Sequence, residues 1–143
     1  MLQTLNNIQR NDAQKSHHNC FVCAAPKSNL SGLGVDFRAD GLDKVQAQFN
    51  VQNCHQGYTG LLHGGIASTL LDGAMTHCLL QQNIPALTAE LSVRYHQPIP
   101  LGATIHIFAE LLQRKRGIFL LAARLVVGEE IMASAKGKFL LPR

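Results

Sequence analysis

A chain of 143 residues is most simply one domain, and its 46% hydrophobic and 15% charged residues favour a folded core over disorder. The net charge of +4 is not gathered into a basic strip with interleaved aromatic residues, so nucleic-acid binding is not expected. No apolar run approaches the roughly 20 residues that span a bilayer, and residues 1–18 lack an apolar signal segment. We expect a cytoplasmic protein without a membrane span, whose four cysteines are thiols.

The sequence predicts a β-hairpin at the start of the domain. Residues 1–18 show no periodicity and are expected to form an N-terminal arm, followed by one domain over residues 19–143. Apolar and polar residues then alternate over 35–39 and over 45–51. Asp40 and Gly41 lie between these two runs, and this dipeptide is typical of hairpin turns.

The period then changes from that of a strand to that of a helix. Residues 64–80 carry two apolar rows, which predicts one long helix that protein encloses on most sides. The remaining polar positions are spaced three or four residues apart and therefore share one face. They are Ser68, Thr69, Asp72 and Thr76.

Alternation returns over 88–95, 105–111, 119–125 and 131–139, which predicts four more strands. Because one helix covers six strands only if the sheet bends, we expect an α+β fold: a curled antiparallel sheet of about six strands wrapped around one long central helix. Within 88–95, alternation places Leu91 on the core face and Thr88, Glu90 and Arg94 on the opposite face. Apolar residues on the nominal outer face, such as Leu120, suggest a covered surface and hence an oligomer.

Two features of the predicted helix need an explanation. Gly64 and Gly65 open it, at about 1 kcal/mol each relative to alanine, and Asp72 places a carboxylate in its apolar part. The glycines serve either close packing or the approach of a ligand to first-turn N–H groups, which have no helical partner and lie at the positive end of the helix dipole. Asp72 is either held by a structural hydrogen bond, to Ser68, Thr76 or a neighbouring chain, or it is catalytic.

The spacing of these features decides how they act together. Gly64 and Asp72 are eight residues apart, which is about 12 Å along a helix. A reacting carbonyl must lie about 3 Å from both its hydrogen-bond donor and its attacking group. One helix cannot supply both to one substrate, whereas two antiparallel helices in a two-fold dimer can. If both features are catalytic, the enzyme is an obligate dimer.

His63-Gly64-Gly65, followed by Asp72 on the same helix, resembles the signature of hotdog-fold acyl-CoA thioesterases of the PaaI-like branch. The similarity includes HQGYTGLLHGG before the helix, TAELSVRYHQPIPLG after it and CFVCAAPKSNLSGLGVDF near the N-terminus, and it covers roughly residues 17–141. The resemblance implies a hotdog fold, a homodimer or a dimer of dimers (a homotetramer), and hydrolysis of an acyl-CoA to a free acid and CoA. CoA is part of that substrate, and no other cofactor is implied.

The resemblance also assigns roles to residues of this chain. Asp72 would be the nucleophile or the general base that acts on water, and the backbone amide of Gly64, with Gly65, would polarise the thioester carbonyl. His63 would orient this loop or contact the thioester. Thr88 falls where some relatives place a hydroxyl that helps to position water.

Four further residues are candidates for substrate contacts. The cationic side chains of Arg94, Lys115 and Arg116 are suited to the phosphates of CoA, and Thr76 lies on the polar face of the helix with Asp72. One departure from the family pattern concerns Gly57, since several relatives carry an asparagine at this position, six residues before His63. Water positioning is therefore expected to differ.

A metal site is the less favoured interpretation of the N-terminal motif HHNCFVC, residues 17–23. The motif has enough donors for zinc, and CxxC is a familiar ligand pair. No second CxxC follows, although Cys54 and His55 could complete a site. We interpret the thiols as a reduced pair and expect no metal. His77 and the other scattered histidines are interpreted as surface or packing residues. The donors of the motif are His17, His18, Cys20 and Cys23.

Two other functions stay open beside thioester hydrolysis. The first is a non-catalytic hotdog module that binds acyl-CoA. The second is a hotdog hydratase or dehydratase, which would need a histidine and an acid at a different spacing.

Overall fold

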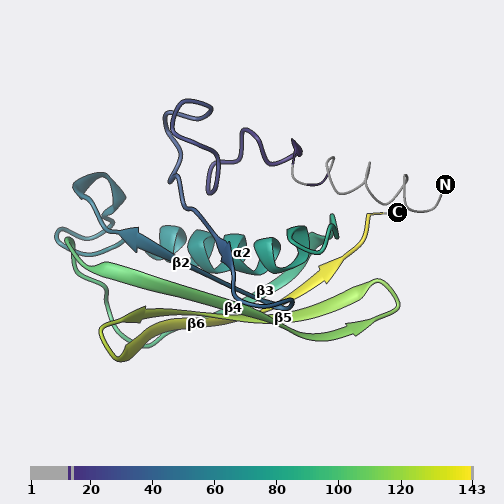
Figure 1. The fold of residues 1–143 in the computed structure, drawn as a ribbon. Coiled ribbons are helices and arrows are strands. Elements are labelled where there is room, and N and C mark those ends of the chain that lie inside the picture. Colours follow the sequence, from purple (N-terminus) through teal and green to yellow (C-terminus); the bar gives the residue numbers. More distant parts are fainter. Residues whose placement is uncertain (1–12, 14, 143) are drawn as a thin grey trace.

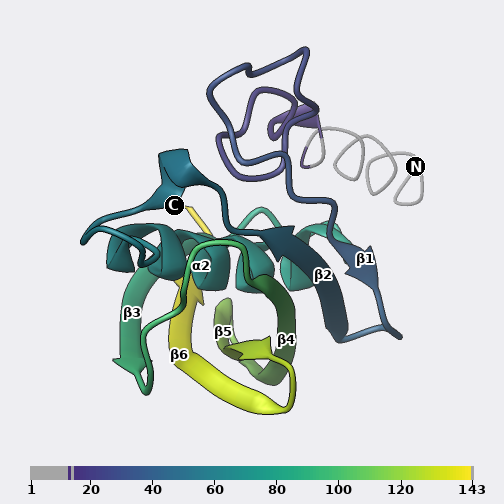
Figure 2. The same ribbon diagram turned by 90° about the vertical axis from the view of Figure 1, so that its left-hand side faces the viewer.

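The computed structural model describes residue 13 and residues 15–142 of the chain. One long helix lies along the concave face of a six-stranded antiparallel sheet, and Figures 1 and 2 show the sheet curving around it. This arrangement confirms the predicted hotdog fold. Residues 1–12 and 14 of the predicted arm lie outside the described residues. The elements are β1 (Arg38–Ala39), β2 (Lys44–Asn50), the 3-10 turn η1 (Asn53–His55), α2 (Gly64–Leu80), β3 (Leu87–Tyr95), β4 (Thr104–Lys115), β5 (Ile118–Val127) and β6 (Glu130–Leu140).

The strand order places β3 at an edge of the sheet. The order is β1-β2-β4-β5-β6-β3, and every neighbouring pair is antiparallel. β1 at the other edge has only two residues, whereas β3 has nine. Among the described residues, β3 pairs on one side only, with β6, so its other side carries unpaired backbone N–H and C=O groups.

The first strand is shorter than the sequence predicts. Alternation begins at Val35, but pairing with β2 involves only Arg38 and Ala39. The N–H of Val35 instead donates a 2.8 Å hydrogen bond to the carbonyl of Val22. The start of the predicted strand is therefore held by the N-terminal segment, residues 15–37, and not by the sheet.

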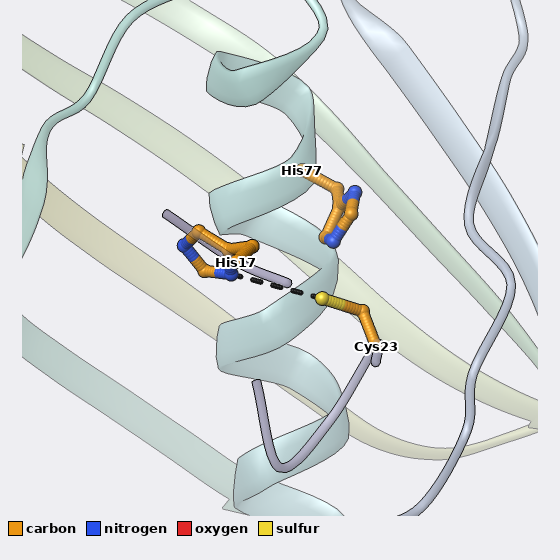
Figure 3. Close-up of side chains that lie close together, drawn as sticks. All are labelled: His17, Cys23 and His77. Carbon is orange, nitrogen blue, oxygen red and sulfur yellow. Dashed lines mark hydrogen bonds between the residues drawn. The ribbon is translucent and has the colours of Figure 1, made fainter. Parts of the chain in front are cut away.

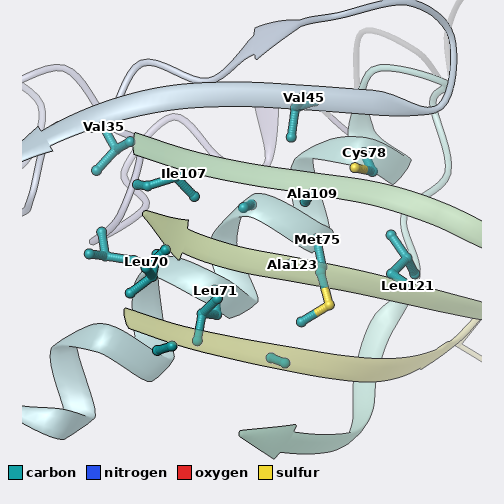
Figure 4. Packing of buried hydrophobic residues seen from close by; sticks show 14 of the residues in the cluster. Val35, Val45, Leu70, Leu71, Met75, Cys78, Ile107, Ala109, Leu121 and Ala123 are labelled. Carbon is teal, nitrogen blue, oxygen red and sulfur yellow. The ribbon is translucent and has the colours of Figure 1, made fainter. Parts of the chain in front are cut away.

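The hydrophobic core lies between helix and sheet (Figure 4). Both predicted apolar rows of α2 are buried except at Ile66, which is partly exposed, and Leu70, Leu71 and Met75 have no exposed surface. Each fully buried side chain of this size contributes about 1.5 to 3 kcal/mol. The sheet contributes inward residues from its long central strands, among them Ile105, Ile107, Leu121 and Leu125.

The N-terminal segment covers the side of α2 that faces away from the sheet (Figures 1 and 2). It approaches the helix at Gly73, where an added Cβ would lie only 2.8 Å from Cγ1 of Val22. Glycine at this position therefore permits the close packing. The helix is enclosed on most sides, as its two apolar rows predict. No helix among the described residues is long and apolar enough to cross a bilayer.

Candidate functional site

The start of α2 leaves one backbone donor free. His63 is the N-cap residue, and its Nδ1 accepts a 2.8 Å hydrogen bond from the N–H of Gly65. Its carbonyl accepts from the N–H groups of Ile66 and Ala67. The N–H of Gly64 donates to no residue that the structure describes. Since the first turn contains no acidic residue, the positive end of the helix dipole is not neutralised there.

This arrangement separates the roles of the predicted glycine pair. The N–H of Gly65 is occupied by the His63 ring, so Gly64 carries the available donor. A Cβ on Gly65 would lie 3.0 Å from that ring, and a Cβ on Gly57 would lie 3.2 Å from Cα of His63. Glycines at 57 and 65 therefore leave space for the N-cap residue.

Tyr95 joins the end of β3 to the start of α2. Its hydroxyl donates a 2.8 Å hydrogen bond to the carbonyl of Gly64, and it lies 2.5 Å from Oγ of Ser68. Alternation over 88–95 places Tyr95 on the same face as Leu91, and it does not predict this contact. The available signal was a phenol at the end of an apolar strand face, since a tyrosine hydroxyl near a core usually finds a partner.

A cavity of about 410 Å³ adjoins the free donor. Gly64 and Tyr95 form part of its wall, and most of the other lining side chains are apolar. Such a cavity is suited to an apolar group attached to a carbonyl, with Gly64 as the hydrogen-bond donor to the carbonyl oxygen. The apolar lining includes Leu61, Leu62, Ala67, Pro98 and Ile99.

The carboxylate of Asp72 is held by Thr88. Oγ1 of Thr88 donates a 2.7 Å hydrogen bond to Oδ1 of the half-buried Asp72. The other suggested partners are engaged elsewhere: Oγ1 of Thr76 donates to the main-chain carbonyl of Asp72, at 2.9 Å, and Ser68 pairs with Tyr95. No lysine or arginine of the described chain forms an ion pair with Asp72.

A β-bulge turns Thr88 toward the helix. The pairing of β3 with β6 shifts between Thr88 and Glu90, so that Thr88 lies opposite Phe139 and Glu90 lies opposite Lys138. Phe139 is fully buried, and facing residues of an antiparallel pair share a face, so Thr88 is on the core side. The prediction from strict alternation, which placed Thr88 on the opposite face, is therefore wrong.

Within one protomer the two parts of the site remain apart. α2 is continuous from Gly64 to Leu80, so Gly64 and Asp72 are separated by about 12 Å along its axis. Each chain thus carries two candidate half-sites, one at Gly64 with Tyr95 and one at Asp72 with Thr88.

The predicted phosphate contacts do not join either half-site of the same protomer. Arg94 faces the outer side of the sheet, where it lines a cavity of about 720 Å³ together with Arg124 and Lys136. Lys115 is the last residue of β4 and Arg116 lies in the turn that follows, at the end of the sheet away from the start of α2 (Figure 1). Arg124 is a basic neighbour of Arg94 that sequence reasoning missed, because its position on the outer face of β5 looked like an ordinary surface residue.

The family model of the thioesterase superfamily matches residues 59–132, which is more than half of the chain. The chain belongs to the thioesterase superfamily. The matched range contains His63, Gly64, Asp72, Thr88 and Tyr95.

The superfamily assignment agrees with individual relatives. Human acyl-coenzyme A thioesterase 13 is 33% identical over 73 residues, which are 50% of this chain and 52% of that protein. The chain thus spans about half the length of the curated relatives it matches. The E. coli PaaI protein superposes with a TM-score of 0.81 at 17% identity, over 96% of this chain and 98% of that one. A Streptococcus mutans protein bound to acetyl-CoA gives a TM-score of 0.71 at 20% identity, over 76% and 88%.

Proposed function

We propose that the protein is an acyl-CoA thioesterase that hydrolyses a thioester to a free acid and CoA. The observation that carries the proposal is the pair of half-sites: a free N–H of Gly64 beside an apolar cavity, and an Asp72 carboxylate held by Thr88. Membership of the thioesterase superfamily and the likeness to acyl-coenzyme A thioesterase 13 support this choice of reaction.

The free edge of β3 suggests how two chains would complete a site. Thr88 near the start of β3 contacts Asp72, and Tyr95 at its end contacts Gly64. If the β3 edges of two copies pair antiparallel about a two-fold axis between Leu91 and Ser92, each Thr88 lies opposite the partner's Tyr95. This register brings Asp72 of one chain toward Gly64 of the other, and symmetry creates two equivalent sites. Adjacent strands lie about 4.8 Å apart, so the half-sites become neighbours.

Exposed apolar residues agree with an oligomer. Leu87, Leu140 and Ile118 are neighbours in register across β3, β6 and β5, and their exposed fractions are 64%, 37% and 39%. Apolar side chains clustered in this way are typical of surfaces that bind another protein. A homodimer, or a dimer of dimers, would cover them.

In such a dimer the thioester carbonyl oxygen accepts a hydrogen bond from the N–H of Gly64. Charge that develops on this oxygen is stabilised by the donor and by the helix dipole. Asp72 of the other chain either removes a proton from the attacking water or attacks the carbonyl itself, to give an anhydride that water then opens. In both routes the C–S bond breaks and CoA leaves as a thiolate, which needs no strong general acid.

The remaining predicted residues would support these steps. His63 would fix the start of the helix by capping Gly65. Thr76 stays a proposed substrate contact, and its hydroxyl also donates to the main-chain carbonyl of Asp72. Arg94, Lys115 and Arg116 stay proposed contacts for the CoA phosphates. Because they join neither half-site of their own protomer, they would have to contact a CoA that is bound at a half-site of another subunit. CoA enters as substrate, and no catalytic cofactor is proposed.

Thiol release from a panel of acyl-CoAs tests the function. Wild-type protein is mixed with short, long and aromatic acyl-CoAs, and free CoA is trapped with a chromogenic disulfide. We expect steady turnover on at least one substrate and loss of turnover in Asp72→Asn, which keeps the shape of the side chain. Binding without turnover would instead support the non-catalytic module, and hydration of an enoyl-CoA without thiol release would support the hydratase.

A further inference from the structure

Three metal-binding side chains gather on the side of α2 that faces away from the sheet. The donor atoms of His17, Cys23 and His77 all lie within 4.8 Å of one another. Nδ1 of His17 is 3.7 Å from Sγ of Cys23, and Figure 3 shows the imidazole of His77 beside that sulfur. Across a tetrahedral zinc ion, imidazole nitrogen and thiolate sulfur are about 3.6 Å apart, so small side-chain movements would suffice for coordination.

The fold brings these donors together from distant parts of the sequence. His17 and Cys23 lie in the N-terminal segment, and His77 lies in the last turns of α2. The segment is seated on the helix by the close approach of Val22 to Gly73, one turn before His77. Because the third donor is remote in sequence, the CxxC motif alone gave no reason to expect it.

His77 carries a buried nitrogen without a partner. Its Nε2 forms no hydrogen bond with any residue that the structure describes, and its ring stacks on Phe37 with centroids 4.6 Å apart. A buried polar atom left unpaired costs about 1 to 3 kcal/mol. Burial, with His17 nearby, lowers the pKa of His77 to about 4, so the ring is neutral at pH 7 and has a lone pair to offer a metal.

Cys20 is the candidate for a fourth ligand, although its sulfur is not among the donor atoms that lie within 4.8 Å of one another, so it would have to move toward them. It is the other thiol of the CxxC motif, and its sulfur accepts a 3.3 Å hydrogen bond from the N–H of Val22. Burial, and then the neighbouring Cys20, raise the pKa of Cys23 to about 12, so the thiol of Cys23 keeps its proton when no metal is bound. A bound metal ion reverses this preference, since it binds the thiolate.

We propose that His17, Cys23 and His77, with Cys20 as the fourth ligand, form a zinc site that fastens the N-terminal segment to α2. Two imidazoles and two thiolates in a tetrahedral arrangement select zinc among the common divalent ions. The site is structural. His77 is five residues after Asp72, which places the two side chains about 140° apart around the helix axis, so the ion would not reach the carbonyl chemistry. The competing arrangement is a Cys23–His17 hydrogen bond without metal.

The segment gives a physical reason for such a site. Residues 15–37 contain little regular secondary structure and are held by a few backbone hydrogen bonds, such as that from Leu33 to Phe21 at 2.7 Å. Irregular segments of this length need side-chain contacts or a cross-link to stay ordered. A metal that joins residues 17–23 to residue 77 closes a long loop and therefore stabilises the folded chain.

Cobalt(II) substitution tests the proposal on the full chain. The reduced, metal-free protein is titrated with cobalt, then with zinc as a competitor. We expect one cobalt per chain, with the thiolate charge-transfer and intense visible bands of tetrahedral coordination, which zinc removes. Zinc should also raise the Tm of the metal-free protein. Cys23→Ser and His77→Gln should weaken binding by more than the about 10- to 100-fold seen when only a ligand-orienting residue is lost.

Two control variants distinguish the proposed metal ligands from residues that are not expected to bind metal. His18→Gln changes the exposed neighbour of His17, and Cys54→Ser removes an exposed thiol, so both should bind cobalt like the wild type. Circular dichroism shows whether each variant is folded. Fewer than one cobalt per chain, a weak octahedral spectrum, or unchanged binding in folded Cys23→Ser would overturn the site. Unchanged binding in Cys20→Ser would overturn its place as fourth ligand.

Discussion

Oγ1 of Thr88 donates a 2.7 Å hydrogen bond to Oδ1 of Asp72 and so joins the edge strand β3 to the middle of α2. A hydrogen bond to a charged group contributes about 1.5 to 3 kcal/mol, and here it fixes one carboxylate oxygen, while the other accepts no hydrogen bond from the described residues. We therefore predict that Thr88→Val, which keeps the shape of the side chain, lowers kcat roughly tenfold or more with little change in KM.

Thr88→Ser is the matched control for this prediction, because it retains the hydroxyl. It should keep most of the wild-type kcat in the thiol-release assay. Equal rates for Thr88→Val and wild type would show that the hydrogen bond does not position the carboxylate for catalysis.

The free N–H of Gly64 can be deleted without breaking the helix. Proline is tolerated at the first helical position, and the preceding His63 has the extended backbone that a following proline requires, with φ −62° and ψ 131°. We predict that Gly64→Pro folds but loses about 100- to 1000-fold in kcat, as expected when one oxyanion donor is removed. The measurement is the thiol-release rate, with the unfolding free energy as a check on folding.

Gly64→Ala serves as the control at the same position. Its Cβ would lie 3.6 Å from the Tyr95 ring, an ordinary van der Waals distance, and the N–H remains. Most of the activity should therefore survive. If proline and alanine reduce the rate equally, the donor role assigned to this N–H is wrong.

The sequence predicted the fold well because its strands and helix differ in period. Alternation over 45–51, 105–111, 119–125 and 131–139 gave strands within a few residues of their bounds, and the two apolar rows gave α2. The exception is the first strand, where Val35 pairs with Val22. Alternation indicates that a segment has one exposed face and one buried face. It does not indicate which other backbone segment forms hydrogen bonds with its N–H and C=O groups.

The candidate site was predicted less completely, because several of its contacts depend on strand pairing and on segments that are remote in sequence. The bulge after Thr88 depends on pairing with β6, so alternation alone gave the wrong face. Tyr95 and His77 gain their partners from segments remote in sequence, and no local pattern marks them. His63, Gly64 and Asp72 were found because a helix start and a buried carboxylate have recognisable chemistry in one short stretch.

The contact of Tyr95 with the start of α2 predicts a stability effect. Tyr95→Phe removes the hydroxyl that bonds the carbonyl of Gly64 and Oγ of Ser68, and we expect the unfolding free energy to fall by about 1 kcal/mol. Denaturant unfolding measures the change. Tyr58→Phe is the control, because that ring is 87% exposed and its hydroxyl bonds no described residue. An equal effect of both variants would contradict the structural role of the Tyr95 hydroxyl.

Acid should weaken the loop that leads into the helix. Partial burial lowers the pKa of His55 below 6.5, and its Nδ1 accepts a 3.0 Å hydrogen bond from the N–H of Gln52, which requires an unprotonated nitrogen. As pH falls below 6.5, the unfolded chain takes up the proton first, so stability is lost toward acid. We expect His55→Asn, which keeps an acceptor but does not titrate, to show a smaller loss of unfolding free energy between about pH 7 and pH 5. An identical loss in both proteins would contradict this.

Subunit mixing decides whether the two half-sites belong to different chains. Asp72→Ala and Gly64→Pro each inactivate both sites of a homodimer, but a mixed dimer combines the intact Gly64 of one chain with the intact Asp72 of the other. When equal amounts of the two variants reassociate at random, half of the dimers are mixed. Each mixed dimer has one intact site of its two, so about a quarter of the wild-type activity should return. Asp72→Ala mixed with the double variant Asp72→Ala/Gly64→Pro contains no intact pair and should stay inactive. If the first mixture also stays inactive while wild type recovers from the same treatment, each site is built within one chain, and the pairing of β3 edges proposed above is wrong.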